Sequence, residues 1–93
     1  MAAPINFHVR VKIFFENFAV QPTWLLLDQK DTRTIKKLCK IIYKNFIGEK
    51  THLELYLENC RIPQWESTRI LHDNDIIFVR ALEKRTQNER LMH

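Results

Sequence analysis

Hydrophobic and polar residues alternate along residues 7–15 of this chain. Val11 and Ile13 occupy every second position, and Arg10 and Lys12 lie between and beside them. A period of two residues is that of a β-strand with one face buried and the other exposed. Residues 7–15 are therefore predicted to form a strand that contributes one face to a core and leaves Arg10 and Lys12 on the other.

A second strand is predicted over residues 23–27, where a short apolar run ends at Asp28. It is expected to pair with the first strand as a hairpin. Trp24 lies inside this run and is expected to be part of the core, because tryptophan is highly buried on average. Trp65 follows Pro63 in a loop, and the sequence leaves open whether it packs over the sheet end or stays partly exposed.

A single amphipathic helix is predicted after the second strand. It has about three turns, and Gly48 is expected to end it. Asp31, Thr32 and Thr34 are all candidates for its N-cap. The apolar positions that recur at helical spacing are Ile35, Leu38, Cys39, Ile42 and Phe46.

Three more strands are predicted in the second half of the chain. Residues 53–57 alternate, a short strand around Ile62 stops at Pro63, and residues 76–82 alternate again after a turn sequence. This element order is that of the ubiquitin-like β-grasp fold. The predicted class is α+β, with one main helix packed on one face of a mixed sheet of four to five strands.

Length and composition favour one globular domain. The chain has 93 residues, of which 45% are hydrophobic, with a single glycine and three prolines. We expect a flexible N-terminus at residues 1–6, a folded domain at 7–83 and a disordered tail at 84–93. No run approaches the roughly 20 apolar residues that span a bilayer, and the start lacks the apolar stretch of a signal peptide. No membrane partner is therefore expected.

Four short segments in register carry a resemblance to a known family. They are residues 23–28 (TWLLLD), residues 55–58 (LYLE), Pro63 with residues 66–69 (ESTR), and residues 73–75 (DND) before the last strand. Together they resemble the N-terminal domains of the coilins, scaffold proteins of nuclear Cajal bodies. The resemblance spans most of residues 7–83. It implies a ubiquitin-like fold, a nuclear location in Cajal bodies, self-association as the activity, and that this chain is a fragment of a longer protein.

Motifs of catalysis or cofactor binding are not found. The four histidines are scattered, and neither Cys39 nor Cys60 belongs to a CxxC pair with metal-ligand spacing. Gly48 stands alone, so there is no glycine-rich phosphate loop. Residues 83–93 contain no glycine for conjugation, which favours a binding module over a tag. We expect no enzyme activity, cofactor, metal or small-molecule substrate, and a reduced core thiol at Cys39.

The open face of the sheet is the main candidate for function, because charged and aromatic residues share it. The acidic turn that carries Asp73 and Asp75 is expected to lie away from Arg10 on the same subunit, so that basic strand and acidic turn meet head to tail between copies. We expect Arg10 to pair with Asp75 in this contact. The alternative is a solvated face and a turn that bonds its own backbone. The predicted interface comprises Arg10, Lys12, Tyr56, Asp73, Asp75, Phe78 and Arg80.

A basic stripe on the helix supports a different function. Lys36, Lys40 and Lys44 repeat every four residues, with no carboxylate between them. Together with a net charge of +4, the stripe favours an adaptor that binds RNA or an acidic or phosphorylated partner. The alternative to binding RNA or an acidic partner is a helix face that is simply exposed to solvent. The expected partners are thus other copies of the chain, with other nuclear-body proteins and RNA as further candidates.

Overall fold

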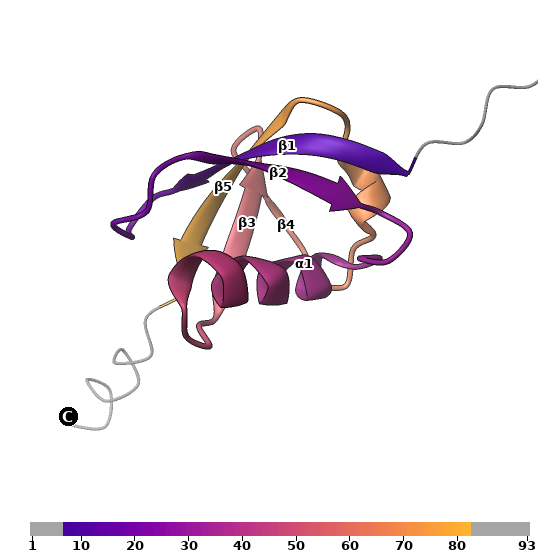
Figure 1. Ribbon diagram of the computed structural model, residues 1–93. Coiled ribbons are helices and arrows are strands. Elements are labelled where there is room, and N and C mark those ends of the chain that lie inside the picture. Colours follow the sequence, from indigo (N-terminus) through magenta and orange to yellow (C-terminus); the bar gives the residue numbers. More distant parts are fainter. Residues whose placement is uncertain (1–6, 83–93) are drawn as a thin grey trace, which may run out of the picture.

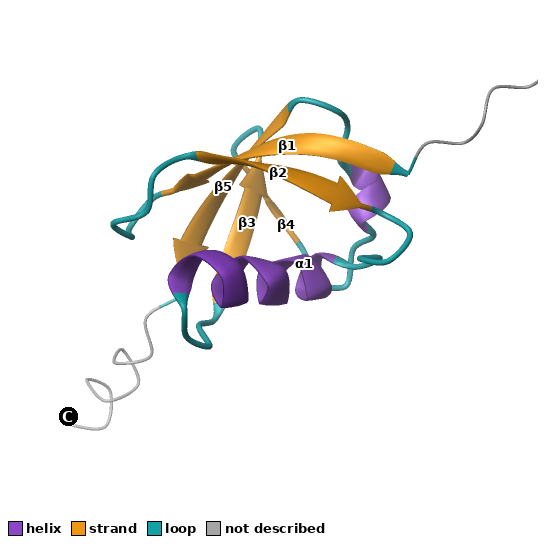
Figure 2. Ribbon diagram, in the orientation of Figure 1, coloured by secondary structure: helices purple, strands orange, loops and turns teal. Residues whose placement is uncertain are grey.

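The computed structural model describes residues 7–82, so the predictions for residues 1–6 and for the tail at 84–93 lie outside the described residues. One mixed sheet with the strand order β2-β1-β5-β3-β4 is packed against one α-helix (Figures 1 and 2). The elements are β1 (His8–Phe15), β2 (Thr23–Asp28), α1 (Ile35–Ile42), η1 (Tyr43–Ile47), β3 (Leu53–Leu57), β4 (Cys60–Ile62), η2 (Thr68–Ile70) and β5 (Asp75–Ala81).

The strand pairing makes the sheet mixed. β1 runs antiparallel to β2 and parallel to β5, and β3 runs antiparallel to both β5 and β4. The helix connects β2 to β3 and lies across one face of the sheet (Figure 1). This arrangement is the α+β architecture predicted from the element order. No helix within residues 7–82 is long and apolar enough to cross a membrane.

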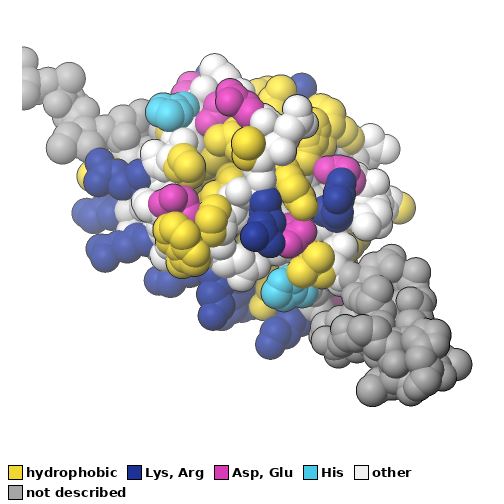
Figure 3. Space-filling model, turned by 180° about the vertical axis from the view of Figure 1, so that it is seen from behind, with side chains coloured by type: hydrophobic (Ala, Val, Ile, Leu, Met, Phe, Trp, Pro, Cys, Tyr) yellow, Lys and Arg dark blue, Asp and Glu magenta, His cyan; other side chains and the backbone are white. Residues whose placement is uncertain are grey.

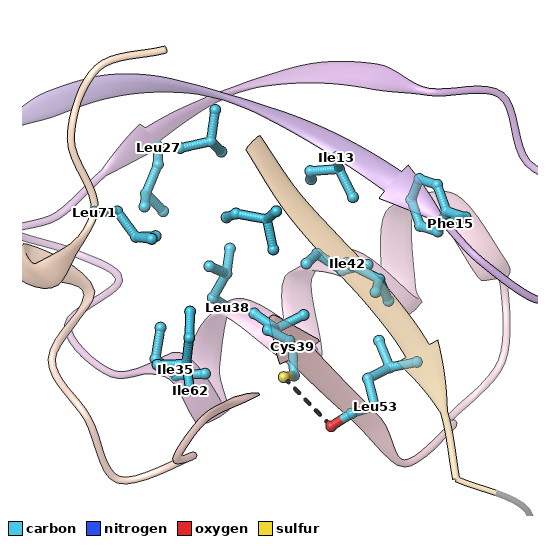
Figure 4. Packing of buried hydrophobic residues seen from close by; sticks show 14 residues of the cluster. Ile13, Phe15, Leu27, Ile35, Leu38, Cys39, Ile42, Leu53, Ile62 and Leu71 are labelled. Atoms are coloured by element: carbon cyan, nitrogen blue, oxygen red, sulfur yellow. Dashed lines mark hydrogen bonds between the residues drawn. The ribbon is translucent and has the colours of Figure 1, made fainter. Parts of the chain in front are cut away.

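The hydrophobic core lies between α1 and the sheet face that carries Val11 and Ile13 (Figure 4). Cys39 is buried in this cluster, and its thiol donates to the carbonyl oxygen of Leu53 at 3.8 Å. Burial raises the pKa of the Cys39 thiol to about 11, because the charged thiolate is poorly solvated there. The predicted core thiol is confirmed, and Cys39 and Cys60 are both free cysteines.

The helix begins at a threonine cap. Thr34 accepts a hydrogen bond from the backbone N–H of Lys37 through its hydroxyl oxygen at 3.3 Å, so it is the N-cap among the three candidates. The two residues between Thr34 and Lys37 bond elsewhere. The backbone N–H of Ile35 donates to the Glu66 carbonyl oxygen and that of Lys36 to the Gln64 carbonyl oxygen, both at 2.9 Å. The first turn of α1 is thereby tied to the loop after β4.

The helix ends at Gly48, as predicted, but its last turn is wider than an α-helical turn. After Ile42 the chain continues as a π-helix, and Gly48 follows with φ of 93° while its N–H donates to the Tyr43 carbonyl oxygen at 2.7 Å. This left-handed conformation favours glycine, which has no Cβ. The wider turn displaces the residues after Ile42 from the regular helical spacing that the sequence suggested.

Trp24 is not part of the core, and this prediction was wrong. Its side chain is 55% exposed. In the β1–β2 register Trp24 lies opposite Lys12, and Lys12 belongs to the sheet face turned away from α1. Leu27 is the β2 residue that is buried instead. Trp65 is 77% exposed in the loop after β4, which resolves the question that the sequence left open.

Candidate protein interface

The sheet face turned away from α1, called here the open sheet face, brings charged and hydrophobic side chains together. A view from the side opposite to Figure 1 shows yellow hydrophobic side chains interspersed with charged ones (Figure 3). By strand register and burial, the open sheet face carries Arg10, Lys12, Phe14, Trp24, Leu26, Glu54, Tyr56, Arg61, Ile76, Phe78 and Arg80.

An aromatic row crosses the middle of the open sheet face. Phe14 on β1 is the register partner of Phe78 on β5, which in turn partners Tyr56 on β3. The Phe14 and Phe78 rings meet edge to face, with centroids 5.3 Å apart. The Arg80 guanidinium carbon lies 5.2 Å from the Tyr56 ring centroid. The structure thus brings together Tyr56, Phe78 and Arg80, three of the residues of the predicted interface.

The charges beside this row are paired within the subunit. Glu54 accepts hydrogen bonds from the Tyr56 hydroxyl at 3.0 Å and from the Arg61 guanidinium at 3.1 Å. The hydrogen bond to Glu54 raises the pKa of Tyr56. Arg80 pairs with Glu16 at 3.1 Å. These contacts hold the aromatic row in a defined arrangement.

A second, more exposed row lies across β2, β1 and β5. Trp24 and Ile76 flank Lys12 in the register, and the Lys12 Nζ lies 5.3 Å from the Trp24 ring centroid. Ile76 is 47% exposed, and Leu26, the register partner of Arg10, is 63% exposed. Sequence reasoning missed Trp24 and Leu26 as surface residues. Ile76 was also absent from the predicted interface. It has the same strand parity as Phe78, and this parity was the sequence signal that could have placed it on the open sheet face.

The acidic turn lies against the basic strand of the same subunit, so the prediction that the two lie apart was wrong. The backbone N–H of Arg10 donates to Asp73 Oδ1 at 2.8 Å, and its guanidinium contacts Asp73 Oδ2 at 3.4 Å. The N–H of Asn74 donates to the Arg10 carbonyl oxygen at 2.6 Å. The parallel pairing of β1 and β5 causes this proximity, because it places the start of β5 beside Arg10.

Hydrogen bonding lowers the pKa of Asp73, chiefly through the backbone N–H of Arg10 and then through its guanidinium. Asp75 is half-buried, and its Oδ2 accepts the backbone N–H of His72 at 2.7 Å. The Arg10 side chain remains 61% exposed. Arg10 therefore projects from the open sheet face, whereas Asp75, the register partner of the buried Val11, lies beside it at the same end of the sheet with the parity of the opposite face.

The helix stripe is divided by the structure. Lys36 and Lys40 border a groove of about 580 Å³ between α1 and β3, together with Lys37 and Lys50. Lys44 lies on the π-helix and is not part of the groove lining. Within residues 7–82, no cluster of three or more His, Cys, Asp or Glu side chains is placed to hold a metal ion.

Solved structures with the same fold are distant in sequence. The ubiquitin of Caldiarchaeum subterraneum superposes with a TM-score of 0.65 at 12% identity, covering 82% of this chain and 95% of that chain. The ubiquitin-like domain of yeast Ddi1 superposes with a TM-score of 0.64 at 12% identity, covering 88% and 99%. The predicted ubiquitin-like β-grasp fold is confirmed.

Sequence comparison adds the family. Residues 9–92 match the family described as Coilin N-terminus. Coilin of Xenopus laevis is 37% identical over 96% of this chain, and coilin of Homo sapiens is 36% identical over 66% of it. The matched regions are 18% and 11% of the lengths of those two relatives. The chain belongs to the coilin N-terminus family.

Proposed function

We propose that this domain is the self-association module of a nuclear-body scaffold, and that copies join head to tail through the open sheet face. The observation that carries the proposal is the exposed row of Trp24 and Ile76 with Leu26 beside it. Soluble monomers seldom expose contiguous apolar patches that are rimmed by charge, unless the patch binds a partner. Membership of the coilin family supports the scaffold role and a nuclear location in Cajal bodies.

The partner that fits best is another copy of the domain, because one end of the sheet carries both charge signs, with Arg10 on the open sheet face and Asp75 beside it with the opposite parity. The intrasubunit ion pair of Arg10 involves one nitrogen of its guanidinium, which has five N–H donors. The remaining donors are available to a carboxylate of the next copy, for which we propose Asp75. The exposed charge pair alone would contribute only about 0 to 1 kcal/mol. Burial of Trp24 and Ile76 supplies the larger share.

Light scattering after size-exclusion chromatography, over a range of protein concentrations at low and high salt, tests this proposal. The mass should climb with concentration beyond a dimer and fall with salt, because head-to-tail contacts propagate. Arg10→Glu and Asp75→Arg should each reduce the mass toward a monomer. The double variant, which exchanges the two charges, should recover part of the association.

The matched control is Asp73→Asn, which removes the negative charge that pairs with Arg10 within the subunit and leaves Asp75 in place. Association should be maintained in this variant. Circular dichroism checks that each variant is folded. A mass that stops at a dimer would indicate a two-fold contact in place of a head-to-tail one. A monomer at all concentrations would refute self-association by this domain.

A further inference from the structure

The groove between α1 and β3 combines a preformed shape with uncompensated positive charge. Its rim carries Lys36, Lys37 and Lys40 from the helix and Lys50 from the segment before β3. Among the described residues, no carboxylate contributes to its lining. None of the ion pairs among residues 7–82 contains a lysine. A cleft that is lined by one sign of charge concentrates counter-ions and attracts partners of the opposite charge.

The floor of the groove is apolar and fixed. Cys39 and Leu53 lie beneath it and are almost fully buried, and the partly buried Tyr43, which packs against the core from the π-helix, contributes to its surface. Gln64 joins the two walls, because its side-chain amide donates to the Leu53 carbonyl oxygen at 2.9 Å and contacts the Cys39 sulfur at 3.9 Å. An apolar side chain of a ligand can therefore be accommodated without reorganisation of the walls.

The positive potential comes from the lysines and not from the start of the helix. The N–H groups of Ile35 and Lys36 are already bonded to the loop that contains Gln64. Lysine ammonium groups on flexible stems can adapt to carboxylates or phosphates at varied spacing. The groove is thus suited to a flexible anionic segment more than to one fixed anion.

We propose that this groove binds an acidic peptide segment of another protein, whose carboxylates or phosphates contact the four lysines while one of its apolar side chains covers the floor. Proteins that bind single-stranded nucleic acid stack the bases on exposed aromatic rings. Among the described residues that line the groove, Tyr43 is the one phenol ring, and it is partly buried against the core, so a run of successive bases would find at most one such platform. A peptide with mixed acidic and apolar residues therefore fits the groove better than RNA does.

Fluorescence anisotropy with a labelled peptide of alternating aspartate and leucine tests the proposal, at a salt concentration near the physiological one. The double variant Lys37→Glu/Lys40→Glu changes two rim residues of the groove. Its matched control, Lys30→Glu/Lys44→Glu, makes the same change in net charge at two exposed lysines outside the groove lining. The groove variant should weaken binding by about tenfold or more, and the control by about twofold or less.

Two further probes distinguish the occupants. The same peptide with serine in place of leucine should bind more weakly to the unmodified protein, because the apolar floor is then left uncovered. Oligouridylate should compete poorly with the peptide. Equal losses of peptide affinity in the groove variant and in its control would overturn the proposal, because net charge alone would then explain the binding. Tighter binding of oligouridylate would overturn it in favour of RNA.

A second copy of the domain is the remaining alternative occupant of the groove, and it has to be distinguished from an acidic peptide. If the peptide does not bind, and the groove variant instead lowers the mass of the protein in light scattering, then the groove belongs to the self-association contact and the proposal is wrong. The groove variant is expected to keep the mass of the unmodified protein in light scattering and to lose peptide binding. Circular dichroism of both double variants confirms that the lost binding does not reflect unfolding.

Discussion

Arg10 and Asp73 contact each other through two atoms of each residue although they are 63 positions apart in the sequence. The carboxylate of Asp73 accepts hydrogen bonds from both the backbone N–H and the guanidinium of Arg10. The turn before β5 is consequently attached near the start of β1. The acidic turn is thus a structural part of the sheet as well as a candidate contact between copies.

This contact predicts a pH dependence of stability. The pKa of Asp73 is lower in the folded protein than its ordinary value of 3.8. A carboxyl group whose pKa falls on folding stabilises the fold above its unfolded pKa, and this contribution is lost as the pH falls through the folded pKa. The melting temperature should therefore fall less between about pH 5 and pH 3 in Asp73→Asn than in the unmodified protein.

Thermal melts followed by circular dichroism measure this difference. The control is Glu49→Gln, which removes an exposed carboxylate that takes part in none of the ion pairs observed within residues 7–82. It should keep the pH slope of the unmodified protein. Identical slopes in all three proteins would show that the bonds to Arg10 do not contribute to stability.

The two tryptophans provide a matched test of the open sheet face. Trp24 lies on that face and Trp65 lies in the loop after β4, and both are well exposed. Trp24→Ala should weaken self-association by at least about 1 kcal/mol, roughly fivefold in Kd, because aromatic anchors dominate interface energies. Trp65→Ala should leave it unchanged. Dilution series in light scattering give both values, and equal effects would argue against the open sheet face.

Substitution of Gly48 is expected to strain the backbone at the end of the helix. Its φ is 93°, and a Cβ added there would meet no atom within 4 Å. Gly48→Ala should lower the free energy of unfolding by about 1 to 2 kcal/mol through backbone strain alone. Gly48→Asn should cost less, because asparagine tolerates the left-handed conformation better. Urea unfolding measures both variants, and an unchanged midpoint for Gly48→Ala would contradict the assigned conformation.

The elements of this fold could be predicted from the sequence because each leaves a local pattern. Alternation marks β1 through Val11 and Ile13, and helical spacing followed by Gly48 marks the end of the helix. The four segments that resemble the coilins were sufficient to predict the family, because each is a short stretch of neighbouring residues, and the family match confirms that prediction. Strand parity also placed Lys12 and Phe78 together on the open sheet face.

Relations across the sheet required the tertiary structure. The run around Trp24 is apolar on both parities, so only its register with Lys12 decides which face it occupies. The contact between Arg10 and Asp73 depends on the parallel pairing of β1 with β5, which no local pattern encodes. The sequence by itself determined the order of elements and the buried face of most of them, because periodicity is a local property. Register, strand neighbours and the groove between α1 and β3 were decided only by the packing of segments that are distant in the chain.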